Sequence, residues 1–297
     1  MKKVLFLAIF IILLCSGCKG ITDATDGLMY KLKEDGTYEV QGLNDEYISK
    51  DSIFVSIPNT YLDKKVTSIS CFASQDSNLE ILNISENIYE IGTEPYNDDI
   101  TPMPQLGTKI LYIESLQEIN VSDNNNIYAS VDGVLFNKDK TRLILYPEGR
   151  RENSYTVIDS VTKIGTLAFS NSKLEEIVLP ANVKEIEYNA FYNSQKLNKI
   201  NLPDSLEILA GGAFNECNHL KEVRIPPKVN KINYATFFNC ASLEKLYIHK
   251  NVEEIHWFAL NQVNKDLIIY CEDESHQPGW DNNWSYNREI IWNYKYK

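Results

Sequence analysis

The chain has 297 residues, of which 43% are hydrophobic and 24% are charged, and its formal net charge is −12. A surface this acidic repels phosphate backbones, so the composition excludes nucleic-acid binding as an expected function. The charges are scattered along the chain rather than gathered in one block, which indicates a folded, solvated surface and not an acidic tail.

The N-terminus has the pattern of an export signal. Residues 1–17 begin with two lysines, continue with an apolar run from Val4 to Leu14 and end in small residues. The run is too short to remain as a span of a hydrocarbon layer about 30 Å thick. The stretch Cys15-Ser16-Gly17-Cys18 that follows resembles a bacterial lipobox, which implies lipidation of Cys18.

Two interpretations of this leader stay open. Lipid on Cys18 would hold the protein to the membrane without a transmembrane helix. Ordinary cleavage near the same bond would leave a soluble secreted protein, and Cys15 stands where a lipobox usually has leucine. Lys19 occupies the position where an inner-membrane retention signal usually has aspartate, so the outer membrane or cell surface is the expected destination. We expect a signal peptide at 1–17, a short tether at 18–26 and membrane contact through the lipid anchor only.

Residues 61–121 carry the first traces of a repeated apolar pattern. Val66 and Ile69 are spaced V-x-x-I, and residues 79–84 read L-x-x-L-x-I. Residues 93–108 interrupt this pattern with three prolines and several acidic residues, which predicts a loop insertion.

Residues 157–262 repeat the same pattern regularly, with a period of 22 residues once and 23 thereafter. A fixed period in this range is typical of a solenoid, in which each unit buries its apolar edge by stacking on its neighbours. The main apolar columns are Val161, Val183, Leu206, Val229 and Val252; Ile164, Ile186, Leu209, Ile232 and Ile255; and Phe169, Phe191, Phe214 and Phe237, with Leu260 as the last member.

Each unit is expected to hold two short extended segments joined by a tight turn. Alternation such as Ile200-Asn201-Leu202 predicts a short strand, and the proline that follows it ends that strand. Stacked strands lie about 4.8 Å apart, so the phenylalanines of successive units should form an offset ladder. We predict a mostly β solenoid of roughly seven rungs, with short turns and 3-10 segments.

The repeat phrases "SVTKIGTLAF", "NLPDSLEILAGGAF" and "EVRIPPKVNKINYATFFNC" resemble the BspA-type, or Treponema-type, leucine-rich repeat. "DGLMYKLKEDGTYEVQG", "DGVLFNKDKTRLILYPEGR" and "IYCEDESHQPGWDNNW" are similar to segments that accompany this repeat. The resemblance implies a leucine-rich-repeat solenoid within one domain over 27–297. Its parts are an N-terminal β-hairpin cap at 27–60, early repeats at 61–121, an inserted β-hairpin at 122–156, regular repeats at 157–262 and a C-terminal cap at 263–297.

The same resemblance implies a non-enzymatic, adhesin-like protein of the cell surface. Its partner would be a host matrix protein, another cell-surface protein or a glycan, and it would need no cofactor. One alternative is a structural or accessory outer-membrane lipoprotein without its own ligand. A carbohydrate-active enzyme is a weaker alternative, because no nucleophile, metal or phosphate-binding motif occurs. We expect neither catalytic nor metal-binding residues, and we interpret all four histidines as surface or turn residues.

The outward-facing column of the repeat strands is the candidate ligand-binding surface, because it varies while the core columns do not. The competing interpretation is that any solvent-exposed column varies. Arginine and tyrosine are enriched where interfaces gain most of their energy. The candidate residues are Asn201, Arg224 and Tyr247, flanked by Lys199, Glu222 and Lys245.

Two groups of residues have competing interpretations. Cys217 and Cys240 share a column one rung apart, which permits a disulfide, but Ser194 in the same column favours buried free thiols. The C-terminal aromatic residues could stack on a sugar, although covering the last open rung explains them better. These residues are Trp280, Trp284, Trp292, Tyr294 and Tyr296.

Overall fold

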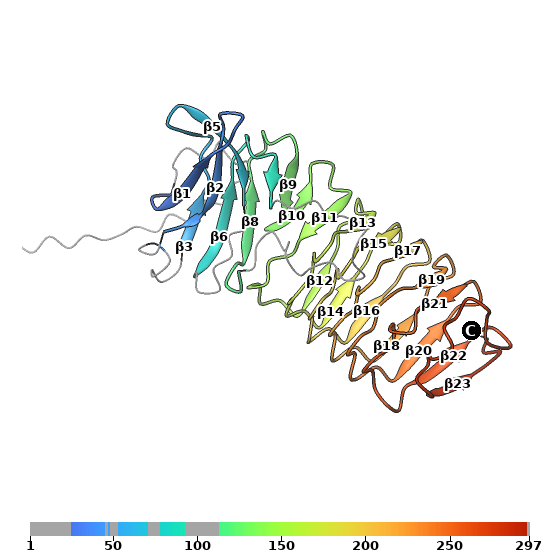
Figure 1. Ribbon diagram of the computed structural model, residues 1–297. Helices are drawn as coiled ribbons and strands as arrows, with labels where there is room; N and C mark the ends of the chain where they lie inside the picture. Colours follow the sequence, from blue (N-terminus) through green and yellow to red (C-terminus); the bar gives the residue numbers. More distant parts are fainter. Residues whose placement is uncertain (1–24, 45–46, 48–52, 71–77, 93–112, 296–297) are drawn as a thin grey trace, which may run out of the picture.

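The computed structural model describes residues 25–44, 47, 53–70, 78–92 and 113–295, which form an elongated β-solenoid (Figure 1). Apart from Tyr47, which is helical, the regular elements of these residues are β-strands, arranged in about nine turns. The predicted mostly β solenoid is therefore confirmed. Strands β22 and β23, which lie in the predicted C-terminal cap, continue the stack as further rungs. The solenoid therefore has more turns than the roughly seven rungs that the repeat pattern predicted.

One side of the solenoid, called here the strand face, carries parallel strands in three successive sheets. Equivalent repeat positions lie opposite each other, as Ile177 does to Ile200 and Val223 to Leu246. The strands are β3 (Ile53–Ser56), β6 (Leu79–Ile84) and β8 (Glu118–Val121); β12 (Ser154–Thr156), β14 (Glu176–Val178) and β16 (Lys199–Asn201); and β18 (Glu222–Arg224), β20 (Lys245–Ile248), β22 (Ile268–Cys271) and β23 (Glu289–Ile291).

The V-x-x-I segments form the second face of the coil, where they pair in register as short parallel strands. An antiparallel hairpin, β1 with β2, opens the solenoid, and β2 continues into this face by pairing with β5. The strands are β1 (Leu28–Leu32), β2 (Tyr38–Leu43), β4 (Thr60–Tyr61), β5 (Lys64–Ile69), β7 (Glu90–Ile91), β9 (Tyr128–Val131), β10 (Val134–Asn137), β11 (Arg142–Leu145), β13 (Lys163–Ile164), β15 (Glu185–Ile186), β17 (Ile208–Leu209), β19 (Lys231–Ile232) and β21 (Glu254–Ile255).

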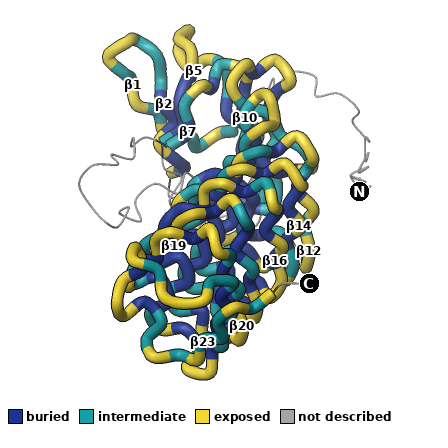
Figure 2. The backbone as a smooth tube through the Cα atoms, turned by 90° about the vertical axis from the view of Figure 1, so that its right-hand side faces the viewer, coloured by how far each residue is buried: buried dark blue, intermediate teal, exposed yellow. Residues whose placement is uncertain are grey.

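The core runs along the inside of the coil, where the buried residues gather (Figure 2). The predicted phenylalanine ladder is present: ring centroids of Phe169, Phe191, Phe214 and Phe237 follow each other at 5.4, 5.0 and 5.6 Å. The ladder begins one step earlier than predicted, because Tyr146 stacks on Phe169 at 5.3 Å. Each ring is in contact with the next, so the aromatic column is one continuous packed element.

The inserted hairpin separates two hydrophobic clusters. Neighbouring side chains of a strand point to opposite sides, and β10 uses this alternation: Leu135 joins the N-terminal cluster, while Val134 and Phe136 join the cluster of the regular repeats. Strands β9, β10 and β11 are antiparallel neighbours, and β11 then pairs with β13 in parallel. The hairpin is thus the element through which the two cores are joined.

Each turn of the regular repeats contains residues in the left-handed region, which the sequence had not revealed. These residues form two columns, and one of them includes Asn189 and Gly212. The other column has φ values between 54° and 64° and is occupied mostly by asparagine, which tolerates this conformation. Its members are Asn171, Asn193, Glu216, Asn239 and Gln262. At Gly212 (φ 66°), an added Cβ would lie 2.0 Å from Asn189 Oδ1, so this turn requires glycine.

A column of small buried side chains closes each turn from inside. Ser194 Oγ donates to the carbonyl oxygen of Phe169 at 2.7 Å, and Cys217 Sγ donates to that of Phe191 at 3.1 Å. Cys240 Sγ makes the same contact with Phe214 at 3.1 Å. The thiols of Cys217, Cys240 and Cys271 are all free, so the expectation of buried free thiols is confirmed. Burial raises the pKa of the Cys271 thiol to about 12 and raises those of the other two.

Tryptophans cover the C-terminal end of the core. Trp280 and Trp284 are almost fully buried and meet edge to face, with centroids 5.0 Å apart. The indole N–H of Trp280 donates to Val252 O at 3.0 Å. The cap interpretation is confirmed for these two residues; Trp292 is half-buried against them, and Tyr296 lies outside the described residues.

Candidate functional site

The outward column of the strand face has three successive stretches with different side chains. On the N-terminal rungs its side chains bind each other: Asn120 Nδ2 donates to Asn83 Oδ1 at 3.1 Å, and Asn83 Nδ2 donates to Ser56 Oγ at 3.0 Å. Farther along, Val178 and Asn201 are exposed. Near the C-terminal end the column becomes aromatic, beginning with Tyr247.

The flanking charges predicted as ligand contacts pair across neighbouring strands. Lys199 Nζ lies 2.5 Å from Glu176 Oε1, and Lys245 Nζ lies 3.9 Å from Glu222 Oε2. Lys199 and Asn201 lie on β16, whereas Glu222, Arg224, Lys245 and Tyr247 lie on the paired strands β18 and β20. The structure therefore brings four of the six candidates together and places the other two on a neighbouring sheet.

Tyr247 and Tyr270 on successive rungs, together with Tyr294 from the segment after β23, form what we call the tyrosine cluster. The rings of Tyr247 and Tyr270 stack with centroids 4.8 Å apart and planes 17° apart. Tyr294 packs against both, at 5.5 and 4.9 Å. All three tyrosines are half-buried, so each keeps some solvent-exposed surface.

Polar groups border the tyrosine cluster. Arg224 lies directly opposite Tyr247 in the strand register, and its guanidinium contacts Asp204 Oδ1 at 2.9 Å. On the other side, His249 Nε2 is 3.2 Å from Glu272 Oε2. The hollow between these groups and the rings has a volume of only about 10 Å³, room for about one water molecule. Flat aromatic surface with a charged rim suits contact with a protein side chain or a sugar ring.

Sequence reasoning identified Tyr247, missed Tyr270, and assigned Tyr294 to the C-terminal cap rather than to this surface. Tyr270 lies 23 residues after Tyr247, which is the repeat period, and the register Tyr247↔Tyr270 confirms the equivalence. Extending the outward column by one period would have found it. Tyr294 reaches the cluster from the segment after β23, outside the repeat pattern, so no periodic signal pointed to it.

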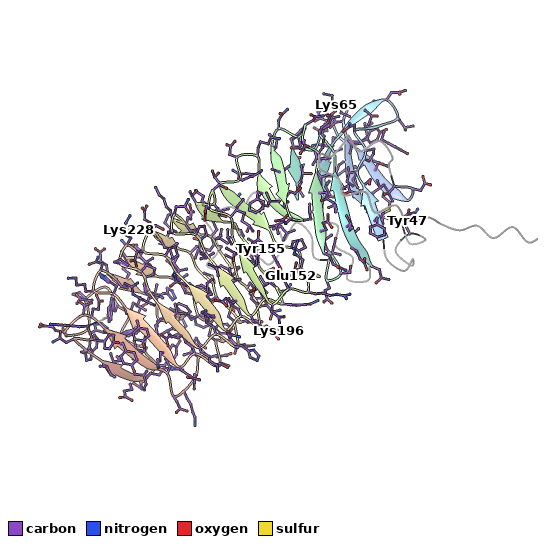
Figure 3. All side chains as sticks on the ribbon, turned by 180° about the vertical axis from the view of Figure 1, so that it is seen from behind. Tyr47, Lys65, Glu152, Tyr155, Lys196 and Lys228 are labelled. Carbon is purple, nitrogen blue, oxygen red and sulfur yellow. The ribbon has the colours of Figure 1, made fainter. Side chains whose placement is uncertain are left out.

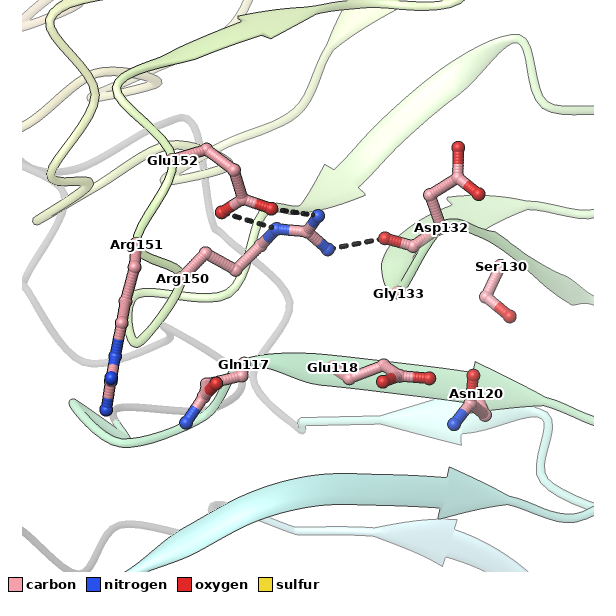
Figure 4. A pocket seen from close by; sticks show the side chains of 9 residues that line it. All are labelled: Gln117, Glu118, Asn120, Ser130, Asp132, Gly133, Arg150, Arg151 and Glu152. Atoms are coloured by element: carbon pink, nitrogen blue, oxygen red, sulfur yellow. Dashed lines mark hydrogen bonds and ion pairs between the residues drawn. The ribbon is translucent and has the colours of Figure 1, made fainter. Parts of the chain in front are cut away.

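A second surface feature is a polar cleft where the strand face is interrupted between β8 and β12 (Figure 4). Its volume is about 730 Å³. Glu118 and Asn120 come from β8, Ser130 and Asp132 from the hairpin, and Arg150 from the segment before β12. The full lining is Gln117, Glu118, Asn120, Ser130, Asp132, Gly133, Arg150, Arg151 and Glu152.

Arg150 braces one side of this cleft. Its guanidinium donates to Glu152 at 2.6 and 3.4 Å and to the carbonyl oxygen of Asp132, and it lies over the Tyr146 ring at 5.4 Å. Burial opposes ionisation of Glu152, but its hydrogen bonds with Arg150 outweigh that effect and lower the pKa of the carboxyl. Burial raises the pKa of nearby Tyr155 to about 12. Figure 3 marks Glu152 and Tyr155 at the start of the regular repeats.

The remaining predicted features either have structural contacts or lie outside the described ranges. His219 Nδ1 contacts Gln195 O, and His256 Nδ1 accepts from Phe258 N at 3.0 Å. Within the described ranges, no three of the His, Cys, Asp and Glu side chains converge in a group that could hold a metal ion. No helix of that same part of the chain is long and apolar enough to cross a bilayer. Residues 1–18 and the 93–108 loop lie outside the described residues.

Comparison with known proteins identifies the repeats and the fold. Residues 150–265 match six copies of the BspA type Leucine rich repeat region. A leucine-rich repeat protein from Eubacterium ventriosum is 17% identical, with a TM-score of 0.57 over 83% of this chain and 82% of that chain. A leucine rich cell surface protein from Faecalibacterium prausnitzii is 18% identical, with a TM-score of 0.50 over 94% and 96%. No protein with a curated description matches the chain.

Proposed function

The chain is a BspA-type leucine-rich repeat protein, and from this premise we propose that it is a non-enzymatic, adhesin-like binding protein of the cell surface. The ligand is a protein or a glycan, and the tyrosine cluster is the centre of the binding surface. One observation carries this proposal: the rings of Tyr247 and Tyr270 are stacked on the outward column beside Arg224, and the ring of Tyr294 packs against both.

A rigid repeat scaffold supports such a role. The parallel strands hold the rings of Tyr247 and Tyr270 in position before any ligand arrives, so little side-chain entropy is lost on binding. Tyrosine contributes large contact area with few rotatable bonds, and arginine adds hydrogen bonds at the rim. The ion pair between Glu176 on β14 and Lys199 on β16 should contribute less to ligand binding, because exposed ion pairs contribute little energy.

A surface location belongs to the same proposal. The Faecalibacterium prausnitzii protein of similar fold is described as a cell surface protein, and residues 1–18 have the pattern of a lipoprotein signal. We expect Cys18 to carry the lipid that holds the protein to the outer membrane. Metabolic labelling with radioactive palmitate should mark the wild type and not Cys18→Ser, and equal labelling of both would contradict the anchor.

Removal of the tyrosine cluster should abolish binding. In the double variant Tyr247→Ala/Tyr270→Ala we expect at least a tenfold loss of affinity for whichever matrix protein, cell-surface protein or glycan binds the wild type, because both central rings are lost. Surface plasmon resonance against a panel of immobilised matrix proteins and glycans measures this effect.

The matched control is Tyr188→Ala, which removes an exposed tyrosine that follows β15 on the second face. Its affinity should equal that of the wild type. Binding that survives in the double variant would place the ligand elsewhere on the protein. If the wild type binds nothing in the panel, the accessory-lipoprotein alternative is favoured, and glycan hydrolysis would favour the enzyme alternative.

A further inference from the structure

The polar cleft between β8 and β12 has a topological cause. The hairpin strands β9 and β10 extend the sheet of the second face, whose order is β17-β15-β13-β11-β10-β9. They add no strand to the strand face, where β8 ends one sheet and β12 begins the next. The insertion therefore leaves a gap between two edge strands that face the same side of the solenoid.

The hairpin tip covers the edge of β8. Ile119 N donates to Gly133 O at 2.9 Å, and Val121 N donates to Ser130 Oγ at 3.0 Å. An uncovered strand edge is a template for pairing with another chain. These contacts prevent another chain from pairing with β8. The edge of β12 is then the one at which another strand could be added.

The edge of β12 that faces away from β14 is open. Glu176 N donates to Asn153 O at 3.1 Å and Val157 N donates to Val178 O at 3.0 Å, so residues 153, 155 and 157 face β14. Because backbone groups alternate along a strand, the N–H and C=O of Ser154 and Thr156 face the opposite way. Among the described residues, neither of these N–H groups has a backbone partner on that side.

Beyond the pair of Arg150 with Glu152, the lining of the cleft carries two carboxylates and one guanidinium, an excess of one negative charge. Glu152 is neutralised by its ion pair with Arg150 at 2.6 Å, and that guanidinium is also held by Asp132 O. Within the described part of the chain, no ion pair engages the carboxylates of Glu118 and Asp132. Both lie toward the hairpin side of the cleft, while Arg151 lies at the opposite end (Figure 4).

We propose that this cleft binds an extended peptide segment of a partner protein, which pairs with β12 as an additional strand and places a lysine or arginine side chain beside Glu118 and Asp132. The volume of about 730 Å³ lies in the range of specific binding pockets. Main-chain hydrogen bonds to Ser154 and Thr156 supply affinity, and the carboxylates supply selectivity. The site is separate from the tyrosine cluster and does not depend on it.

Two capped ten-residue peptides test the proposal on the full chain. One alternates threonine with lysine, and the other alternates threonine with glutamate. Fluorescence anisotropy at low salt should show saturable one-to-one binding of the lysine peptide, with at least tenfold lower affinity for the glutamate peptide. Absence of lysine-peptide binding, or equal affinity for both peptides, overturns the proposal.

Two variants separate strand pairing from simple charge attraction. Thr156→Pro removes an N–H on the open edge of β12 and retains the bonds of β12 to β14, so it should lower the affinity at least tenfold. Thr156→Val keeps that N–H and should bind as the wild type does. Glu118→Gln/Asp132→Asn should also lose at least tenfold, whereas Tyr247→Ala/Tyr270→Ala should lose nothing. Unchanged binding by Thr156→Pro overturns the proposal.

Amide hydrogen exchange on the wild-type protein tests the same pairing without any variant that could fail to fold. The bound lysine peptide should slow amide hydrogen exchange at Ser154 and Thr156 and leave exchange in β20 unchanged. Exchange at those amides that the peptide does not alter overturns strand pairing. If neutral glycans bind in the cleft and Thr156→Pro does not affect them, the cleft is a sugar site and the peptide proposal is wrong.

Discussion

Replacement of Phe214 by alanine is expected to lower the free energy of unfolding by about 3–5 kcal/mol, the range for loss of a buried aromatic side chain. The ring is fully buried between Phe191 and Phe237, with centroids 5.0 and 5.6 Å away and nearly parallel planes. Its removal leaves a cavity and breaks two ring contacts at once. Urea unfolding followed by circular dichroism measures the change.

Phe238→Ala is the matched control. Phe238 follows the ladder residue Phe237 but is only half-buried, and it stacks on Phe258 at 5.1 Å. Truncation there should cost less than half as much, because less apolar area is removed and the site is open to solvent. Equal losses in Phe214→Ala and Phe238→Ala would show that the ladder is no more important than any other aromatic contact.

The inward columns could be predicted because a solenoid imposes the same packing at every rung. The spacing of Phe169, Phe191 and the ring that follows was enough to predict the ladder and its direction. Tyr146 was missed as its first member because "LYPEGR" lies in the inserted segment, where the period gives no register. The periodic pattern therefore predicted the fold well only where the repeat is uninterrupted.

The surfaces were harder to predict, because they depend on contacts between segments with unequal spacing. The period could have led from Tyr247 to Tyr270, but Tyr294 joins them from outside the repeats. The cleft depends on a hairpin that adds strands to one face and none to the other, and no local pattern near Glu118 or Arg150 records this. The left-handed turn residues, such as Glu216, also escaped because several residue types occupy one column.

Replacement of Leu135 and of Phe136 by alanine, one at a time, is expected to destabilise opposite parts of the protein. The two residues are neighbours on β10, both fully buried, and they point into different hydrophobic clusters. Leu135→Ala should cost about 2–5 kcal/mol in the N-terminal cluster, and Phe136→Ala about 3–5 kcal/mol in the cluster of the regular repeats. In a repeat protein, stability is approximately a sum of the stability of each repeat and of the interfaces between adjacent repeats. Each substitution should therefore destabilise mainly the rungs next to it.

Hydrogen exchange followed by mass spectrometry distinguishes the two effects. Leu135→Ala should speed exchange mainly in β6 and β8, and Phe136→Ala mainly in β13 and β14, because opening is governed by the local core that each strand covers. The control is Asp139→Ala in the exposed turn after β10, which should change neither region. If Leu135→Ala speeds exchange in β14 as much as in β6, the hairpin transmits the loss across both cores. The solenoid would then behave as a single unit rather than as two cores that share one strand.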